Sequence, residues 1–333
     1  MVEVKRSVLA RAATFLRFVR QQRAARLRLA TSLAPLDPQA SIKLTGAEAG
    51  WTMSGHHVGR GDRFRVTATG HHWLARPLGL AIEPRSTVYM RIADGPCRKL
   101  IADEAVYEAW ADGEVAFLSK ALGEFADESG NLRTGKRMQH KPGIGIDIAA
   151  SDAAPADPGT PDRWRYLWRI GEGVIYTGDP DDISVATHGD VGILQRDIDL
   201  PLTDATQLSW EWLIEALPSD LPEDLAFTHD YLSIAVEFEN GRDLTYMWSA
   251  ALPRDHVFRC PLNYWCDWET HWVLRSGKDG IGQWHGEARN IAADYHAALG
   301  APLPNKIVRV WLIANSVFQR KQGKARFRHI AVG

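Results

Sequence analysis

The sequence has little cysteine, no long apolar run and no excess of charge of one sign. Three cysteines in 333 residues are too few for a disulfide framework. No apolar run of about 18 residues occurs, so no membrane-spanning helix is predicted. The 39 Lys and Arg nearly balance the 41 Asp and Glu, which argues against a nucleic-acid partner held by bulk positive charge. A Gly-x-Ser-x-Gly nucleophile motif is also missing.

Tryptophan is the residue type that stands out. Of 13 tryptophans, seven lie between Trp210 and Trp284. The other proportions are those of a folded protein, with 45% hydrophobic and 24% charged residues. At about 150 residues per domain, the length predicts two domains, each able to bury its own core.

Residues 1–38 are predicted to form a basic amphipathic helical segment. The first 34 of them contain eight Lys and Arg and a single acid. Val8, Ala12, Phe15 and Val19 recur at three- and four-residue steps, which is typical of one helix face. Because arginines interrupt every apolar stretch, we do not expect a secretory signal peptide here.

Two environments suit this helix. Its basic side chains favour peripheral membrane contact through residues 1–34, or a partner such as a second copy in a homo-oligomer. Alternatively, the helix packs against its own chain, because long arginine stems cover apolar surface readily. We expect a cytoplasmic protein that can associate with a membrane, and a periplasmic location is the alternative.

The rest of the chain is predicted to be mainly β, as two antiparallel, jelly-roll-like β-sandwiches. Residues 41–150 contain short alternating runs such as Arg63–Ala68 and Val88–Ile92, separated by glycine-containing turns. Residues 151–162 are small, acidic and turn-forming, which indicates a linker. Strand patterns resume in residues 163–333, the second sandwich.

Two local signals stand out in the second half. Asn240-Gly241, between two apolar runs, predicts a β-hairpin turn. The segment Ala288–Leu299 predicts a helix that ends at Gly300.

The first sandwich contains a spaced set of aromatic, glycine and strand residues: Trp51, Gly61-Asp62, Arg63–Gly70, Trp73, Val88–Ile92 and Asp127–Gly130. This pattern resembles the galactose-binding PA-IL-type bacterial lectins. The resemblance implies a lectin-like sandwich that recognises a sugar.

The same resemblance implies a calcium ion that bridges two sugar hydroxyls. Its ligands would fall near Lys120, Glu124, Asp127 and Glu128. Lys120 stands where the family has an acid, and an ammonium group there would repel calcium. Without Lys120, the acids Glu124, Asp127 and Glu128 are the remaining candidate ligands of a rearranged calcium site. The alternative is that they form a solvated acidic loop.

The second half carries a longer set of spaced motifs: Leu208–Trp212, His229–Tyr231, Val236–Phe238, Leu244–Trp248, Gly282–Trp284, Arg289–Ile291 and Asp294-Tyr295. Their order and spacing resemble an uncharacterised bacterial family, the domain of unknown function 3047. The resemblance implies a jelly-roll-like sandwich related in architecture to carbohydrate-binding modules, without an established activity.

This half departs from the family at two places. The family has paired acids where this chain has His229-Asp230, and an acid-rich stretch where it has Asn315–Gln319. The chain has therefore either lost an acidic or metal-binding feature or uses its cleft differently.

The aromatic residues are the main ligand-binding candidates. In strands, alternate side chains share a face, so Trp210 pairs with Trp212, and Tyr246 with Trp248. Such pairs can stack on a sugar ring in an aromatic cleft, although buried core packing is the commoner use of an indole. Four more tryptophans and a tyrosine complete the set of candidates, which is Trp212, Tyr246, Trp248, Tyr264, Trp265, Trp268, Trp272 and Trp284.

Residues 263–272 mix tryptophans with Asp267, Glu269 and His271 and have no clean period. That composition is typical of a loop or a cleft edge, where ligand contact and packing are both expected.

Five residues are candidates for acid–base catalysis: His229, Asp230, Asp267, Glu269 and His271. A histidine beside a carboxylate exchanges protons near neutral pH, and paired carboxylates can serve a glycosidase. Each of these residues alone is more often structural.

Zinc is a weaker expectation. Cys260, Cys266 and His271 are of zinc-binding types, but their spacing is not that of a standard site.

The sequence thus favours a carbohydrate-recognising protein with an aromatic cleft in its second domain. One alternative is a hydrolase or lyase that acts on a glycoside or another ring-shaped substrate through the His, Asp and Glu residues. The other is an oligomeric or membrane-surface assembly protein.

Overall fold

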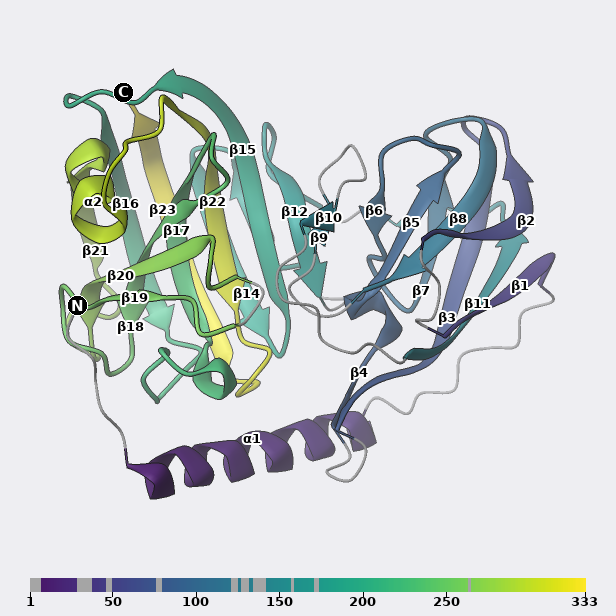
Figure 1. Cartoon of the computed structure of the whole chain (residues 1–333), viewed down its shortest axis with the longest axis horizontal. Helices are drawn as coiled ribbons and strands as arrows, with labels where there is room; N and C mark the ends of the chain where they lie inside the picture. Colours follow the sequence, from purple (N-terminus) through teal and green to yellow (C-terminus); the bar gives the residue numbers. More distant parts are fainter. Residues whose placement is uncertain are drawn as a thin grey trace. The chain divides into compact units, whose positions relative to one another are not determined.

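The computed structural model describes residues 7–28, 38–45, 50–75, 80–120, 125–126, 132–133, 142–156, 159–170, 174–262 and 265–333. The chain forms two compact units. One comprises Val19–Pro158 and Arg169–Glu172, and the other Met1–Phe18, Gly159–Trp168 and Gly173–Gly333. Both are built of β-sheets, so the predicted mainly β, sandwich-type fold is confirmed (Figure 1).

The first half contains two facing sheets. A five-stranded sheet has the order β1-β11-β3-β4, with β7 also paired to β3, and a four-stranded sheet has the order β2-β8-β5-β6. All of these pairs are antiparallel. The strands are β1 (Ala40–Leu44), β2 (Thr52–Val58), β3 (Arg63–Ala75), β4 (Leu80–Ile82), β5 (Val88–Ile92), β6 (Arg98–Lys99), β7 (Glu104–Glu108), β8 (Gly113–Ser119) and β11 (Pro142–Ala150), with a separate pair β9 (Phe125–Ala126) and β10 (Leu132–Arg133) and a 3-10 turn at Pro84–Ser86.

Alternation builds the core of this half. Phe64, Val66 and Ala68 on β3 are buried, as are Ile146 and Ile148 opposite them on β11. They pack with apolar residues of β5 and β8 from the other sheet. The alternating runs therefore form strands because each presents one apolar face to the space between the sheets.

The second half has a larger pair of sheets. A seven-stranded sheet has the order β12-β15-β22-β17-β18-β20-β19, and a five-stranded sheet has the order β13-β14-β23-β16-β21. Strands β18 and β20 pair in parallel. The pairs β15–β22, β22–β17, β17–β18, β20–β19, β13–β14, β14–β23, β23–β16 and β16–β21 are antiparallel. The strands are β12 (Arg165–Ile170), β13 (Tyr176–Asp179), β14 (Asp182–His188), β15 (Val191–Pro201), β16 (Gln207–Ala216), β17 (Tyr231–Phe238), β18 (Asp243–Ser249), β19 (Val257–Arg259), β20 (Glu269–Ser276), β21 (Trp284–Asn290), β22 (Lys306–Asn315) and β23 (Gln322–Val332), with a 3-10 turn at Ala226–Thr228.

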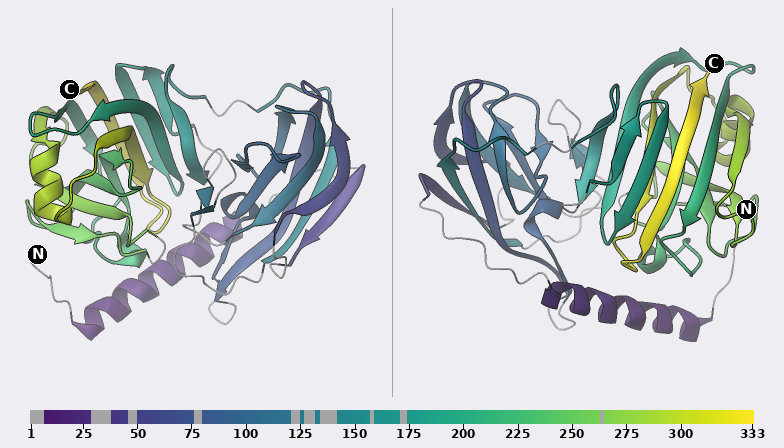
Figure 2. Two further views of the ribbon diagram at one scale, coloured as in Figure 1. Left: turned by 45° about the horizontal axis from the view of Figure 1, so that its top comes forward. Right: turned by 180° about the vertical axis from the view of Figure 1, so that it is seen from behind.

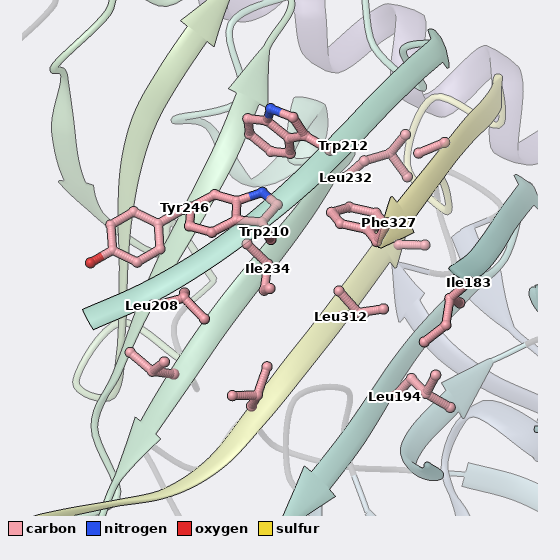
Figure 3. Close-up of a cluster of buried hydrophobic side chains, with 14 of the residues drawn as sticks. Ile183, Leu194, Leu208, Trp210, Trp212, Leu232, Ile234, Tyr246, Leu312 and Phe327 are labelled. Atoms are coloured by element: carbon pink, nitrogen blue, oxygen red, sulfur yellow. The ribbon is translucent and has the colours of Figure 1, made fainter. Parts of the chain in front are cut away.

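The core of the second half is rich in aromatic rings (Figure 3). Trp210 and Trp212 of β16 meet edge to face, with ring centroids 5.6 Å apart. Across the sandwich, Trp210 lies 5.7 Å from Tyr246, and Trp212 lies 5.8 Å from Trp248. These side chains fill the space between the sheets.

The two local signals predicted in this half are found in the structure. Asn240-Gly241 joins β17 to β18, and Gly241 has a φ of 78° that glycine adopts without strain. Helix α2 (Ile291–Leu299) ends at Gly300 as expected but begins three residues later than predicted. Residues up to Asn290 pair as β21, and the Asn290 side chain then caps the helix by accepting from the Ala293 N–H.

The N-terminal helix, α1 (Val8–Arg28), lies within the predicted basic segment. Its Phe15 and Phe18 rings each lie 5.0 Å from Phe227, and Phe18 also lies 6.2 Å from Phe318. These contacts favour packing against its own chain. Among the described residues, no helix is both long and apolar enough to cross a membrane. Peripheral membrane contact and homo-oligomer formation stay predictions.

Two glycines of the first half allow a direct test of backbone crowding. Gly61 and Gly70 both have positive φ, of 91° and 89°. A Cβ on Gly70 would lie 1.9 Å from the Gly143 carbonyl oxygen, whereas one on Gly61 would meet nothing within 4 Å. We predict that Gly61→Ala lowers the free energy of unfolding by about 1–2 kcal/mol. Gly70→Ala should lower it clearly more, as measured by equilibrium denaturation, and equal losses would contradict this account.

Candidate functional site

Three of the predicted acid–base residues come together on the outer side of the seven-stranded sheet. His229 lies just before β17, and Glu269 and His271 lie two residues apart on β20, so they share a face. Cys260, which follows β19, joins them, because its backbone N–H donates to the Glu269 carbonyl oxygen at 3.0 Å. The main core lies on the opposite side of this sheet.

The four side chains converge on one point. The Cys260 Sγ lies 3.4 Å from the His229 Nε2, and the His271 Nε2 lies 3.5 Å from the Glu269 Oε2. One nitrogen, sulfur or carboxylate oxygen from each residue lies within 4.8 Å of all the others. All four residues are buried.

Neighbouring groups orient the cluster from outside. The Glu223 main-chain oxygen lies 2.6 Å from the His229 Nδ1, so Nδ1 carries the proton and Nε2 offers its lone pair to the cluster. Burial, together with the nearby His271, lowers the pKa of His229 to about 3, which keeps the ring neutral. The Tyr231 hydroxyl donates to the Glu269 Oε1 at 2.8 Å, which leaves Oε2 facing His271.

Aromatic rings enclose the His271 ring. Phe258 stacks on it at 4.8 Å, and Tyr231 and His229 meet it edge to face at 4.9 and 4.7 Å. Neither ring nitrogen of His271 has a hydrogen-bond partner. His229 and His271 are 0% exposed, so in this structure a substrate would not reach them. Their residue types can hold a metal ion, but their burial does not suit catalysis.

The other two acid–base candidates lie outside the cluster. The buried Asp230 accepts from the backbone N–H groups of Phe318 (3.0 Å) and Gln319 (2.5 Å). Burial raises its pKa to about 8, against the lowering effect of those two amides. Asp267 is exposed. Through these two hydrogen bonds, Asp230 organises the 315–319 turn. Its neighbour His229 instead points into the cluster with Cys260, Glu269 and His271.

Most of the aromatic ligand-binding candidates are core residues. Trp212, Tyr246 and Trp248 are 0% exposed, and Trp265 is 5% exposed. A ligand cannot stack on them unless the core opens, so they do not line an open cleft. The sequence could not decide this, because two indoles on one strand face suit a core and a platform equally.

The remaining aromatic candidates differ in their surroundings. Trp268 is partly buried, and Tyr264 lies outside the described residues. Trp272 is partly buried and packs against the main core, with its Nε1 at 3.4 Å from the Asp255 carboxylate. Trp284 is partly exposed and stands apart from the core cluster.

Trp284 lies on the outer face of the five-stranded sheet, which Figure 2 (right) shows with β23, in yellow, between β14 and β16. The Arg328 guanidinium lies 3.8 Å from the centroid of the Trp284 ring, and that of Arg326 lies 5.3 Å away. Arg328 donates through Nε to Glu211 at 2.6 Å, and Arg326 pairs with Asp182. This face combines a flat ring with two arginine–carboxylate pairs.

The predicted calcium ligands Glu124, Asp127 and Glu128 lie outside the described residues. Calcium binding by the first half therefore stays a prediction. Cys266, the other cysteine of zinc-binding type in this region, is not part of the described cluster, and its thiol donates to the Asp267 carboxylate at 3.8 Å.

The contacts of Asp230 predict a structural role. Asp230→Ala would leave two amide N–H groups without an acceptor and should lower the free energy of unfolding by about 2–4 kcal/mol. Asp230→Asn keeps one carbonyl oxygen and should give an intermediate loss. Chemical denaturation of the three proteins measures this order, and an Asp230→Ala variant as stable as the parent would contradict it.

Comparison with known proteins bears on the second half. Residues 175–331 match the model of a family described as "Protein of unknown function (DUF3047)", which confirms the family resemblance of this half. No curated protein matches the chain. Nothing in these comparisons bears on the lectin resemblance of the first half, which stays a prediction.

Several solved structures are similar to the chain at low identity. The xyloglucanase domain of NopAA, a type three effector from Sinorhizobium fredii, in complex with cellobiose, is 9% identical over 52% of this chain and 92% of that domain, with a TM-score of 0.31. The tandem CBM22-1-CBM22-2 domain of Paenibacillus barcinonensis Xyn10C is 10% identical over 91% and 99%, with a TM-score of 0.25. The agarase AgWH50C is 8% identical over 52% of this chain and 24% of the enzyme, with a TM-score of 0.25. At this level of similarity they carry no argument about a ligand.

Proposed function

We propose that the second half of the chain binds a carbohydrate on the outer face of its five-stranded sheet. The observation that carries this proposal is Trp284, a partly exposed indole outside the core that has the Arg328 and Arg326 guanidinium groups over its ring, each paired with a carboxylate.

The residue types on this face suit a sugar. An indole presents a flat apolar surface to the C–H groups of a sugar ring. Arginine offers paired donors and a carboxylate offers paired acceptors, and both match adjacent hydroxyl groups. The Arg328–Glu211 and Arg326–Asp182 pairs are about a third exposed, and the second Glu211 oxygen lies 3.5 Å from the His329 Nδ1.

Strand pairing fixes these groups in rows across the sheet. Trp284 on β21 stands opposite Leu213 on β16, which stands opposite Arg326 on β23. In the next row, Glu211 lies between Gly286 and Arg328. Because the side chains come from paired strands, their spacing is set before a ligand arrives, which lowers the entropy cost of binding.

Small residues leave space beside the indole. Gly286 and Ala288 follow Trp284 on the same face of β21, and both are exposed. A Cβ on Gly286 would meet only the Glu211 side chain, at 4.0 Å. A flat ligand can therefore extend along β21 from the indole.

The catalytic alternative has less support. Of its five residues, His229, Glu269 and His271 converge but are buried, while Asp230 and Asp267 lie apart from them. Binding is thus the function that the exposed groups favour.

The proposal is tested by removing the ring. We expect the full chain to bind at least one member of a panel of soluble polysaccharides and oligosaccharides, which includes xyloglucan, cello-oligosaccharides and agaro-oligosaccharides. Trp284→Ala should weaken that binding at least about tenfold, because a buried aromatic contact is worth about 2 kcal/mol or more. Isothermal titration calorimetry measures the affinity.

Gly286 provides a matched pair of variants. Gly286→Gln places a long side chain over the proposed platform and should abolish binding, while Gly286→Ala adds one methyl group and should change affinity little. Unchanged thermal stability of both variants would show that the fold is kept. Binding that survives both Trp284→Ala and Gly286→Gln, or no binding to any member of the panel, would contradict the proposal.

A further inference from the structure

We propose that His229, Cys260, Glu269 and His271 hold a structural zinc ion on the outer side of the seven-stranded sheet. This site is independent of the proposed carbohydrate-binding face, which lies on the other sheet of the same sandwich.

The donor set is one that zinc prefers. Two imidazole nitrogens, one cysteine sulfur and one carboxylate oxygen are its usual protein ligands. Neutral imidazoles with a thiolate and a carboxylate carry a total charge of −2, which a Zn²⁺ ion cancels. A neutral assembly is the form of a buried ionic site that costs least. Among the described residues, His271 is the ion-pair partner of Glu269. It neutralises the carboxylate only when its buried imidazole is protonated.

The distances fit a tetrahedral ion. Zinc bonds of about 2.0–2.3 Å place neighbouring ligand atoms about 3.3–3.8 Å apart. The Cys260 Sγ and His229 Nε2 are separated by 3.4 Å, and the Glu269 Oε2 and His271 Nε2 by 3.5 Å. The widest separation within the set is no more than 4.8 Å, so small side-chain rotations would complete the tetrahedron.

Hydrogen bonds alone do not account for His271. This ring is 0% exposed, its Nδ1 has no hydrogen-bond partner, and its Nε2 meets only the Glu269 carboxylate, at 3.5 Å and without hydrogen-bond geometry. Buried polar atoms without partners cost about 1–3 kcal/mol each and are rare. A metal ion would bind one of these nitrogens directly.

Hydrogen bonds with neighbouring groups orient two of the four ligands, as the residues around the ligands do in known zinc sites. The Glu223 carbonyl oxygen fixes the His229 tautomer that leaves Nε2 free to bind. The Tyr231 hydroxyl holds one Glu269 oxygen and leaves the other for the ion. Four protein ligands and no exposed position are the features of a structural site, whereas a catalytic zinc keeps a position open to water.

Zinc content is the direct test. The full chain, purified without a histidine tag, should contain about one zinc ion per chain by inductively coupled plasma mass spectrometry. Chelator should remove the zinc and lower the Tm, and added Zn²⁺ should restore both. Replacement by Co²⁺ should give the visible d–d bands of a tetrahedral ion together with a thiolate-to-cobalt charge-transfer band.

Two cysteine variants separate the site from nonspecific binding. Cys260→Ser should lose the zinc and the charge-transfer band, and its Tm should no longer respond to chelator. Cys266→Ser, a change to a more exposed cysteine six residues away, should keep all three. The cobalt spectrum of the parent chain remains informative if Cys260→Ser does not fold.

Three outcomes would overturn the proposal. One is a parent chain that contains no zinc and takes up none. Another is equal zinc loss in Cys260→Ser and Cys266→Ser. The third is a stoichiometric copper or iron ion in place of zinc. None of these results affects carbohydrate binding at Trp284, so the two proposals fail separately.

Discussion

Aromatic packing between the two sheets of the second half is the interaction on which its other features depend. Trp210 and Trp212 of β16 lie against Tyr246 and Trp248 of β18, and all four are buried. Each such side chain removes on the order of 150–250 Å² from water, worth about 4–6 kcal/mol at about 25 cal/mol per Å² before conformational entropy is subtracted. By joining the sheets, these rings fix which side of every strand faces outward.

The polar atoms of these rings explain why such a core is tolerated. The Trp212 Nε1 donates to Glu287, the Trp248 Nε1 donates to the Gly277 carbonyl oxygen, and the Tyr246 hydroxyl donates to Asp294. Arg275 pairs with Glu287 and Arg289 with Asp294, so the accepting carboxylates are themselves neutralised. Three of the four rings thus reach polar partners at the edge of the sandwich, where β20, β21 and α2 supply them, whereas the buried Trp210 Nε1 has no hydrogen-bond partner.

The outer faces of the two sheets have different chemistry. The seven-stranded sheet carries a second buried layer, in which His229, Cys260, Glu269 and His271 meet. A buried polar cluster needs charge compensation, which favours a metal ion. The five-stranded sheet leaves Trp284 and its arginine–carboxylate pairs partly exposed, which favours a ligand from solution. The outer side of the seven-stranded sheet therefore supports a structural metal ion, and the outer side of the five-stranded sheet supports ligand binding.

The sequence by itself determined the β-sandwich class, the Asn240-Gly241 turn and the end of α2 at Gly300, because these depend on alternation and on local backbone preferences. It indicated a loop or a cleft edge for residues 263–272, whereas the structure places Glu269 and His271 on one face of β20. Only the tertiary structure decided that Cys260 and His229 join them, since residues 229, 260 and 271 are brought together by strand pairing over long sequence separations. It also decided that Trp212 and Trp248 are core while Trp284 is not. A strand pattern shows which side chains share a face, but only the packing of a second sheet determines which face is buried.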